Sequence, residues 1–175
     1  MNKSVLTFPL TLGLSDGIIT TLMLISHTIL HGNLISAGLA LRVAFGSAFV
    51  GGFSFFIAEY SRLRGEISRT SKQLMLRSPA YLIRSRIGRD ILVESVTGTG
   101  ASVLSGFIGS LLPLAIAVAF PRTGAYAVYT ADGVLAFLGA GIAKSVSGNY
   151  VFWIMTMFIL GVSVSLMGDF LNLVG

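Results

Sequence analysis

Apolar residues fall into five long segments along this chain, separated by short polar stretches. The segments span about residues 5–30, 34–60, 94–120, 126–146 and 149–174. They lack the regular polar–apolar alternation of a strand. At roughly 21 to 27 residues, each is long enough for a helix to cross the roughly 30 Å hydrocarbon core of a bilayer. The pattern predicts an all-α integral membrane protein with five transmembrane helices.

Composition agrees with this prediction. The chain has 175 residues, of which 54% are hydrophobic and 11% are charged, whereas about a quarter of the residues in a soluble domain are charged. We therefore expect one transmembrane domain over residues 1–175. No A-x-A-like cleavage site follows the first segment, so we interpret it as a retained helix and not as a signal peptide. The chain has no cysteine, which excludes disulfides, thiolate metal sites and thiol catalysis.

The long polar stretch lies between the second and third segments, over about residues 61–93. Eight of the twelve lysines and arginines fall between Arg62 and Arg89. Ser78 followed by Pro79 is typical of a helix start. We therefore expect a short basic insertion of amphipathic helices lying at the headgroups of the membrane lipid. Lipid explains the positive charge better than nucleic acid, which we do not expect as a partner.

Charge also predicts the orientation of the chain. Cytoplasmic loops carry an excess of lysine and arginine, so the insertion should be cytoplasmic. Five helices then place the N-terminus in the cytoplasm and the C-terminus outside. Because the chain is short, we expect it in a prokaryotic plasma membrane.

Small residues recur four positions apart in two of the segments. Ser102 and Gly106, Ser105 and Gly109, and Gly161 and Ser165 form such pairs, listed here in chain order. This spacing is typical of helices that pack closely in membranes. It indicates tight packing without identifying the partner helix.

The first segment carries an acid, Asp16, near its middle. A carboxyl group at that depth costs roughly 2.5–3.5 kcal/mol on insertion scales. Its side chain should therefore face a protein interior or a watery cavity. Acids inside a membrane commonly mark an ion or proton path, so we treat Asp16 as the first candidate site residue.

Three further side chains share a helical stripe with Asp16, namely Thr20, Met23 and His27. A carboxylate, a hydroxyl, a thioether and an imidazole together suit a divalent transition metal, and the carboxylate and imidazole also exchange protons. A purely structural interpretation stays open for each of the three. Thr20 can bond its own backbone, Met23 can pack, and His27 can lie at the outer interface.

Glu59 lies at the inner end of the second segment. It can be solvated, or it can pair with Arg62 or Arg64. Asp132, in the fourth segment, is a weaker second candidate. The sequence contains no pattern that resembles a nucleophile–base pair or a phosphate-binding loop, so we do not expect an enzyme or a resident cofactor.

Three short motifs stand out in the first three segments. The segment Gly13–Gly17 reads Gly-Leu-Ser-Asp-Gly, Ser54 is followed by Glu59 and Tyr60, and the segment Gly109–Leu114 reads Gly-Ser-Leu-Leu-Pro-Leu. In this order they resemble the first-helix signature, the second-helix motif and the third-helix glycine–proline stretch of the vacuolar iron transporter family. The five-helix layout with one cytoplasmic insertion also agrees.

The resemblance implies a homodimer that exports divalent iron, and sometimes manganese, from the cytoplasm in exchange for protons. In the family the pathway runs between the two subunits. By motif match, Asp16 would face this pathway and Glu59 would lie near its cytoplasmic entrance. The metal ion and protons are then the substrates, and no further cofactor is implied.

Two departures separate this chain from the family pattern. Phe55 stands where the family usually has methionine, so Met23 is the sulfur nearest to Asp16 in the pattern. The insertion is short and basic, with Glu66, Asp90 and Glu94 as its acids, whereas the family's is often rich in glutamate. These departures also favour an alternative, a non-transporting relative that acts as a membrane scaffold or lipid-binding protein.

The orientation is testable because the chain is free of cysteine. In intact cells, Ser71→Cys should resist an impermeant thiol reagent, because the insertion should be cytoplasmic. Asn33→Cys, in the first predicted outer turn, should react with it. The opposite labelling would invert the orientation and turn export into import.

Overall fold

The computed structural model of this chain describes residues 3–30, 35–73, 86–120, 125–146 and 148–170. Within these ranges the chain is helical and contains no strand. Its helices are α1 (Lys3–Leu30), α2 (Ala37–Gln73), α4 (Arg86–Ala119), α5 (Ala125–Val146) and α6 (Tyr150–Phe170). Each contains a stretch long and apolar enough to span a membrane. For the described residues, the predictions of an all-α chain and of five helices able to span a membrane are confirmed.

The helices at the basic end are longer than predicted. We expected the second helix to end near residue 60 and the third to begin near residue 94, whereas α2 continues to Gln73 and α4 begins at Arg86. Residues 61–73 are therefore a continuation of α2 and not a separate surface helix. Arg62 supports this continuity, because it pairs with Glu59 and Glu66, one turn away on either side. The predicted helix start at Ser78 and Pro79 lies outside the described residues.

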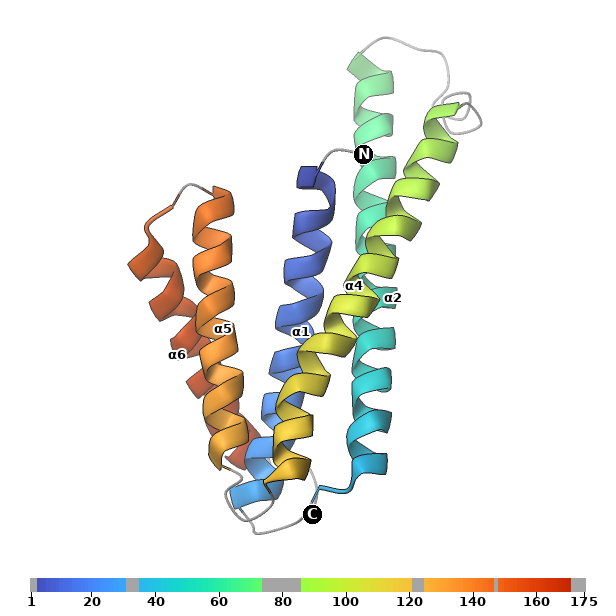
Figure 1. Cartoon of the computed structure of the whole chain (residues 1–175). Coiled ribbons are helices and arrows are strands. Elements are labelled where there is room, and N and C mark those ends of the chain that lie inside the picture. Colours follow the sequence, from blue (N-terminus) through green and yellow to red (C-terminus); the bar gives the residue numbers. More distant parts are fainter. Residues whose placement is uncertain (1–2, 31–34, 74–85, 121–124, 147, 171–175) are drawn as a thin grey trace.

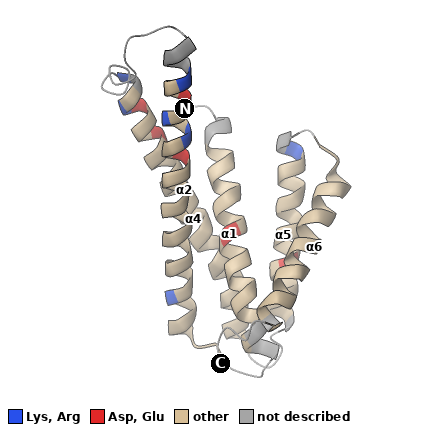
Figure 2. Cartoon of the chain, turned by 180° about the vertical axis from the view of Figure 1, so that it is seen from behind, with Lys and Arg blue, Asp and Glu red and all other residues tan. Residues whose placement is uncertain are grey.

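The helices form two groups on either side of α1 (Figure 1). One group is α2 and α4, which pack along each other, and the second is the α5–α6 pair. Helix α1 contacts all four. Lysine, arginine, aspartate and glutamate gather mainly where α2 and α4 project past the other helices (Figure 2).

Backbone contact between α1 and α4 depends on glycine. A Cβ at Gly13 would overlap the carbonyl oxygen of Ser102, and one at Gly17 would overlap that of Gly106. A Cβ at Gly109 would lie 2.7 Å from the carbonyl oxygen of Leu14. The predicted small-residue pairs on α4 thus pack on α1, which presents a Gly-x-x-x-Gly pair of its own.

The third small-residue pair, on α6, has two partners. Gly161 lies against the Asp132 side chain of α5. Ser165 hydrogen-bonds Ser26 of α1, with 2.7 Å between the hydroxyl oxygens. Helix α6 therefore rests on both α5 and α1.

Large apolar side chains cover the outward faces of the helices. Exposed examples come from all five helices and include Phe8, Phe49, Leu104, Phe137 and Phe152. A soluble monomer rarely exposes contiguous apolar surface on this scale. The exposure fits a surface that lipid covers, as expected of an integral membrane protein.

The glycine contact between α1 and α4 predicts opposite effects of two similar substitutions. Gly17→Ala should destabilise the fold by about 1–3 kcal/mol, the usual cost of overpacking, because the new methyl group meets a backbone carbonyl. Gly46→Ala on α2 is the matched control, since nothing lies within 4 Å of its added Cβ. It should be neutral, or stabilising by up to about 1 kcal/mol through helix propensity. Thermal unfolding in detergent measures both, and equal effects would contradict the proposed packing.

Candidate functional site

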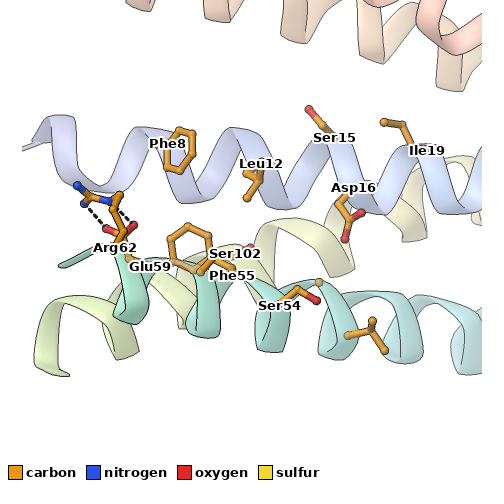
Figure 3. Close-up of a pocket in the computed structure, with 13 residues that line it drawn as sticks. Phe8, Leu12, Ser15, Asp16, Ile19, Ser54, Phe55, Glu59, Arg62 and Ser102 are labelled. Atoms are coloured by element: carbon orange, nitrogen blue, oxygen red, sulfur yellow. Dashed lines mark hydrogen bonds and ion pairs between the residues drawn. The ribbon is translucent and has the colours of Figure 1, made fainter. Parts of the chain in front are cut away.

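A cavity of about 570 Å³ lies between α1 and α2, with one contribution from α4 (Figure 3). Both predicted acids, Asp16 and Glu59, line it. The remaining lining residues are mostly apolar or carry a hydroxyl: Phe8, Leu12, Ser15, Ile19, Val50, Gly51, Ser54, Phe55, Ala58, Arg62 and Ser102. The fold thus brings together two carboxylates that are 43 positions apart in the sequence.

Asp16 lies at the middle of the apolar stretch Leu6–Ser26 of α1. Gly13 and Gly17 turn toward α4, which leaves Asp16 on the neighbouring face of α1, pointing toward α2 (Figure 3). Gly51 of α2 makes room for it, because a Cβ there would overlap the Asp16 Oδ2 atom. In the single chain Asp16 is exposed, and no hydrogen bond or ion pair joins its carboxylate to any described side chain. A carboxylate is therefore available for an ion at mid-span depth.

Glu59 is held by a bidentate ion pair. Its two carboxylate oxygens accept hydrogen bonds from Arg62, at 2.6 Å from Nη2 and 2.9 Å from Nε. Arg62 also donates from Nη1 to Glu66 at 2.6 Å. Of the alternatives for Glu59, the structure shows the pairing with Arg62. A cation that binds Glu59 must compete with this guanidinium.

Phe55 separates the two carboxylates. It follows Ser54 on α2, is 5% exposed, and lies between Asp16 and the Glu59–Arg62 pair (Figure 3). Its ring packs against Phe8 of α1, with 6.3 Å between the centroids. The residue that departs from the family motif is thus part of the cavity wall.

A second cavity, of about 370 Å³, adjoins the first at the charged end. It shares Phe8, Phe55, Glu59 and Arg62 with the first cavity and adds Glu94 of α4. Glu94 was not predicted to be a site residue. The sequence does hold a signal for it. Glu94 begins the third apolar segment and Glu59 lies at the end of the second, so both acids fall at the same end of the predicted helices.

Of the side chains predicted to share a stripe on α1, Asp16 lines this cavity. The Thr20 hydroxyl donates to the backbone carbonyl of Asp16 at 2.8 Å. The backbone of Met23 packs against Gly168 of α6. Neither residue is among those that line the cavity, and the hydrogen bond of Thr20 matches the structural interpretation left open for that residue. His27 belongs to α1, but its side chain lies outside the described residues.

The ligand set of a single chain is small. Within the described residues, no group of three or more histidines, aspartates or glutamates could hold a metal ion. Around Asp16 the cavity offers carboxylate and serine oxygens and no sulfur. Oxygen ligands suit harder ions such as Mn²⁺ better than they suit soft late transition metals.

Comparisons with protein-family models, curated proteins and solved structures found no match for this chain. The resemblance to the vacuolar iron transporters therefore rests on residues 13–17, 54–60 and 109–114 alone, and it stays a prediction.

Proposed function

We propose that this chain is a metal–proton antiporter that exports divalent iron, with manganese as a second substrate, from the cytoplasm. One observation carries the proposal. A single cavity joins Asp16, at mid-span depth, to Glu59 at the charged end of the helices. Carboxylates at two depths of one cavity suit a cation path, because each supplies a charge-compensating oxygen ligand where lipid supplies none.

The exchange begins at the charged end. A divalent ion meets Glu59 and Glu94, which border the same cavity, and displaces Arg62 from Glu59. It then passes Phe55 to Asp16, where it displaces a proton, since a carboxylate must be deprotonated to bind metal. Alternating exposure of Asp16 lets a proton from outside release the metal there.

A second copy of the chain completes the site in this proposal. One carboxylate compensates only half the charge of a divalent cation. Asp16 is exposed on the single chain, and lipid is a poor cover for a carboxylate. Two copies that face each other through α1 and α2 would bring two Asp16 carboxylates to one ion and shield both from lipid.

A second candidate function is that of a non-transporting membrane scaffold or lipid-binding protein. Two observations favour it: Glu59 is already paired with Arg62, and most of the surface of the cavity wall is apolar. Such a wall can hold a lipid acyl chain. Metal uptake by proteoliposomes distinguishes the two candidates, because the scaffold carries no flux.

Asp16→Asn should abolish proton-coupled metal flux and leave a folded protein. The amide keeps the size of the side chain but removes the charge and the exchangeable proton. Thr20→Val is the matched control one turn away, because its hydroxyl bonds backbone, and it should retain flux. Both variants are assayed in proteoliposomes beside a size-exclusion profile. Flux at the wild-type rate in Asp16→Asn would remove this residue from the mechanism.

Phe55→Met should shift selectivity toward iron or cobalt over manganese, because a thioether favours later transition metals. Met23→Leu serves as the control, since Met23 does not line the cavity, and it should leave selectivity unchanged. The measurement is flux of one metal in competition with the other. Unchanged selectivity in Phe55→Met would show that side chain 55 does not reach the ion.

A further inference from the structure

The α5–α6 pair contains an acid that the proposed exchange does not use. Asp132 of α5 is 6% exposed, and its Oδ1 atom has no hydrogen-bond partner among the described residues. It does not line the Asp16 cavity, and α5 lies across α1 from α2 (Figure 1). A buried carboxyl oxygen without a partner is rare, because desolvation without compensation costs several kcal/mol.

The surroundings of Asp132 are apolar. Its carboxyl group lies against Gly161 of α6, where an added Cβ would be 2.5 Å from Oδ1. Ala131 and Leu135, its neighbours on α5, pack with Ile18 and Leu22 of α1 in a buried cluster. Gly161 thus provides the space that Oδ1 occupies, and the described residues around this atom supply no hydrogen-bond partner.

Charged and titratable groups on the helices around α5 lie elsewhere. On α1, Asp16 points toward α2, and the side chains of Lys3 and His27 are outside the described residues. On α6, Tyr150 is at the far end from Gly161, and the side chain of Asp169 is not described. The remaining groups are Arg86, Arg89, Asp90 and Glu94 at the start of α4, and Tyr126, Tyr129 and Lys144 on α5 itself. No described hydrogen bond or ion pair joins any of them to Asp132.

An ionised carboxylate in this position would be a buried, uncompensated charge, which proteins avoid by binding a proton. We propose that Asp132 is a proton-binding site, separate from the Asp16 cavity, that is neutral while α6 covers it. Release of the proton requires water to reach the carboxyl group, and therefore requires α6 to move away from α5 at Gly161. Asp132 lies in the half of its apolar stretch nearer Tyr126, so this water comes from the end opposite the charged ends of α2 and α4.

Infrared spectroscopy of the purified protein tests the protonation state directly. A protonated carboxyl group absorbs separately from a carboxylate. We expect the Asp132 carbonyl band near neutral pH in the wild type and in Asp16→Asn, and loss of this contribution in Asp132→Asn, where any band that remains belongs to Asp16. An unchanged band in Asp132→Asn would overturn the proposal, because Asp132 would then be ionised in the folded protein.

Labelling of the wild type provides a second test that needs no variant to fold. Dicyclohexylcarbodiimide, an apolar reagent, modifies protonated carboxyl groups in apolar surroundings, and peptide mass spectrometry locates the adduct. We expect modification of Asp132 near neutral pH that falls as the pH rises. If Asp132 is not modified at any pH, the proposal of a bound proton is contradicted. Modification that stays constant to high pH would show a permanently neutral structural group and would equally overturn a site that releases its proton.

Whether this proton takes part in exchange rests on the proposed function. In proteoliposomes with external acid, Asp132→Asn should lose the acceleration of metal flux by acid, while metal binding by the detergent-solubilised protein is unchanged. If the wild type carries no metal, the proposed function fails. The infrared and labelling results would still decide the protonation of Asp132.

Discussion

Backbone contact between α1 and α4 is the constraint on which the rest of this structure depends. Gly13 and Gly17 lie directly against the carbonyl oxygens of Ser102 and Gly106, so neither helix can rotate without overlap. In a membrane, where apolar side chains gain little from leaving lipid, such close packing is a main source of helix association. It fixes the rotation of α1, and this rotation directs Asp16 to α2 and leaves the opposite side of α1 for α5 and α6.

Two acids within the apolar stretches, Asp16 and Asp132, differ in what their surroundings permit. Asp16 borders an open cavity, where water or a cation can compensate its charge. Asp132 lies against a glycine, beside residues of an apolar cluster, and there a proton is the group that can compensate its charge. Each depends on a glycine of the facing helix, Gly51 for Asp16 and Gly161 for Asp132. Glycine in these helices therefore does more than bring backbones together, since it also makes room for carboxyl groups at the helix interfaces.

Hydrophobic patterning was enough to predict five helices, because length and apolarity alone determine which segments can cross a bilayer. Helix ends at the basic side were predicted less well, since Arg62 and its two glutamates continue α2 past the point where the apolar pattern stops. Asp16 and Glu59 were predictable from depth and motif, and the structure places both at one cavity. Thr20 and Met23 do not line this cavity. Helical periodicity predicts which residues share a face of α1, but it does not predict how far along that face a neighbouring helix leaves a cavity. The role of Glu94 at the second cavity depends on a contact between distant segments, which no local pattern contains.

The double ion pair of Arg62 has a consequence for which ions Glu59 can bind. Its guanidinium is a cation tethered beside Glu59, present at a high effective concentration whatever the surrounding solution contains. A monovalent ion that replaces the guanidinium at Glu59 exchanges one positive charge for another, so the electrostatic energy of the carboxylate improves little. A divalent ion brings twice the charge to the same carboxylate and frees Arg62 to remain with Glu66. In the proposed exchange, Glu59 would therefore discriminate between ions by valence before the ligand geometry at Asp16 could discriminate by element.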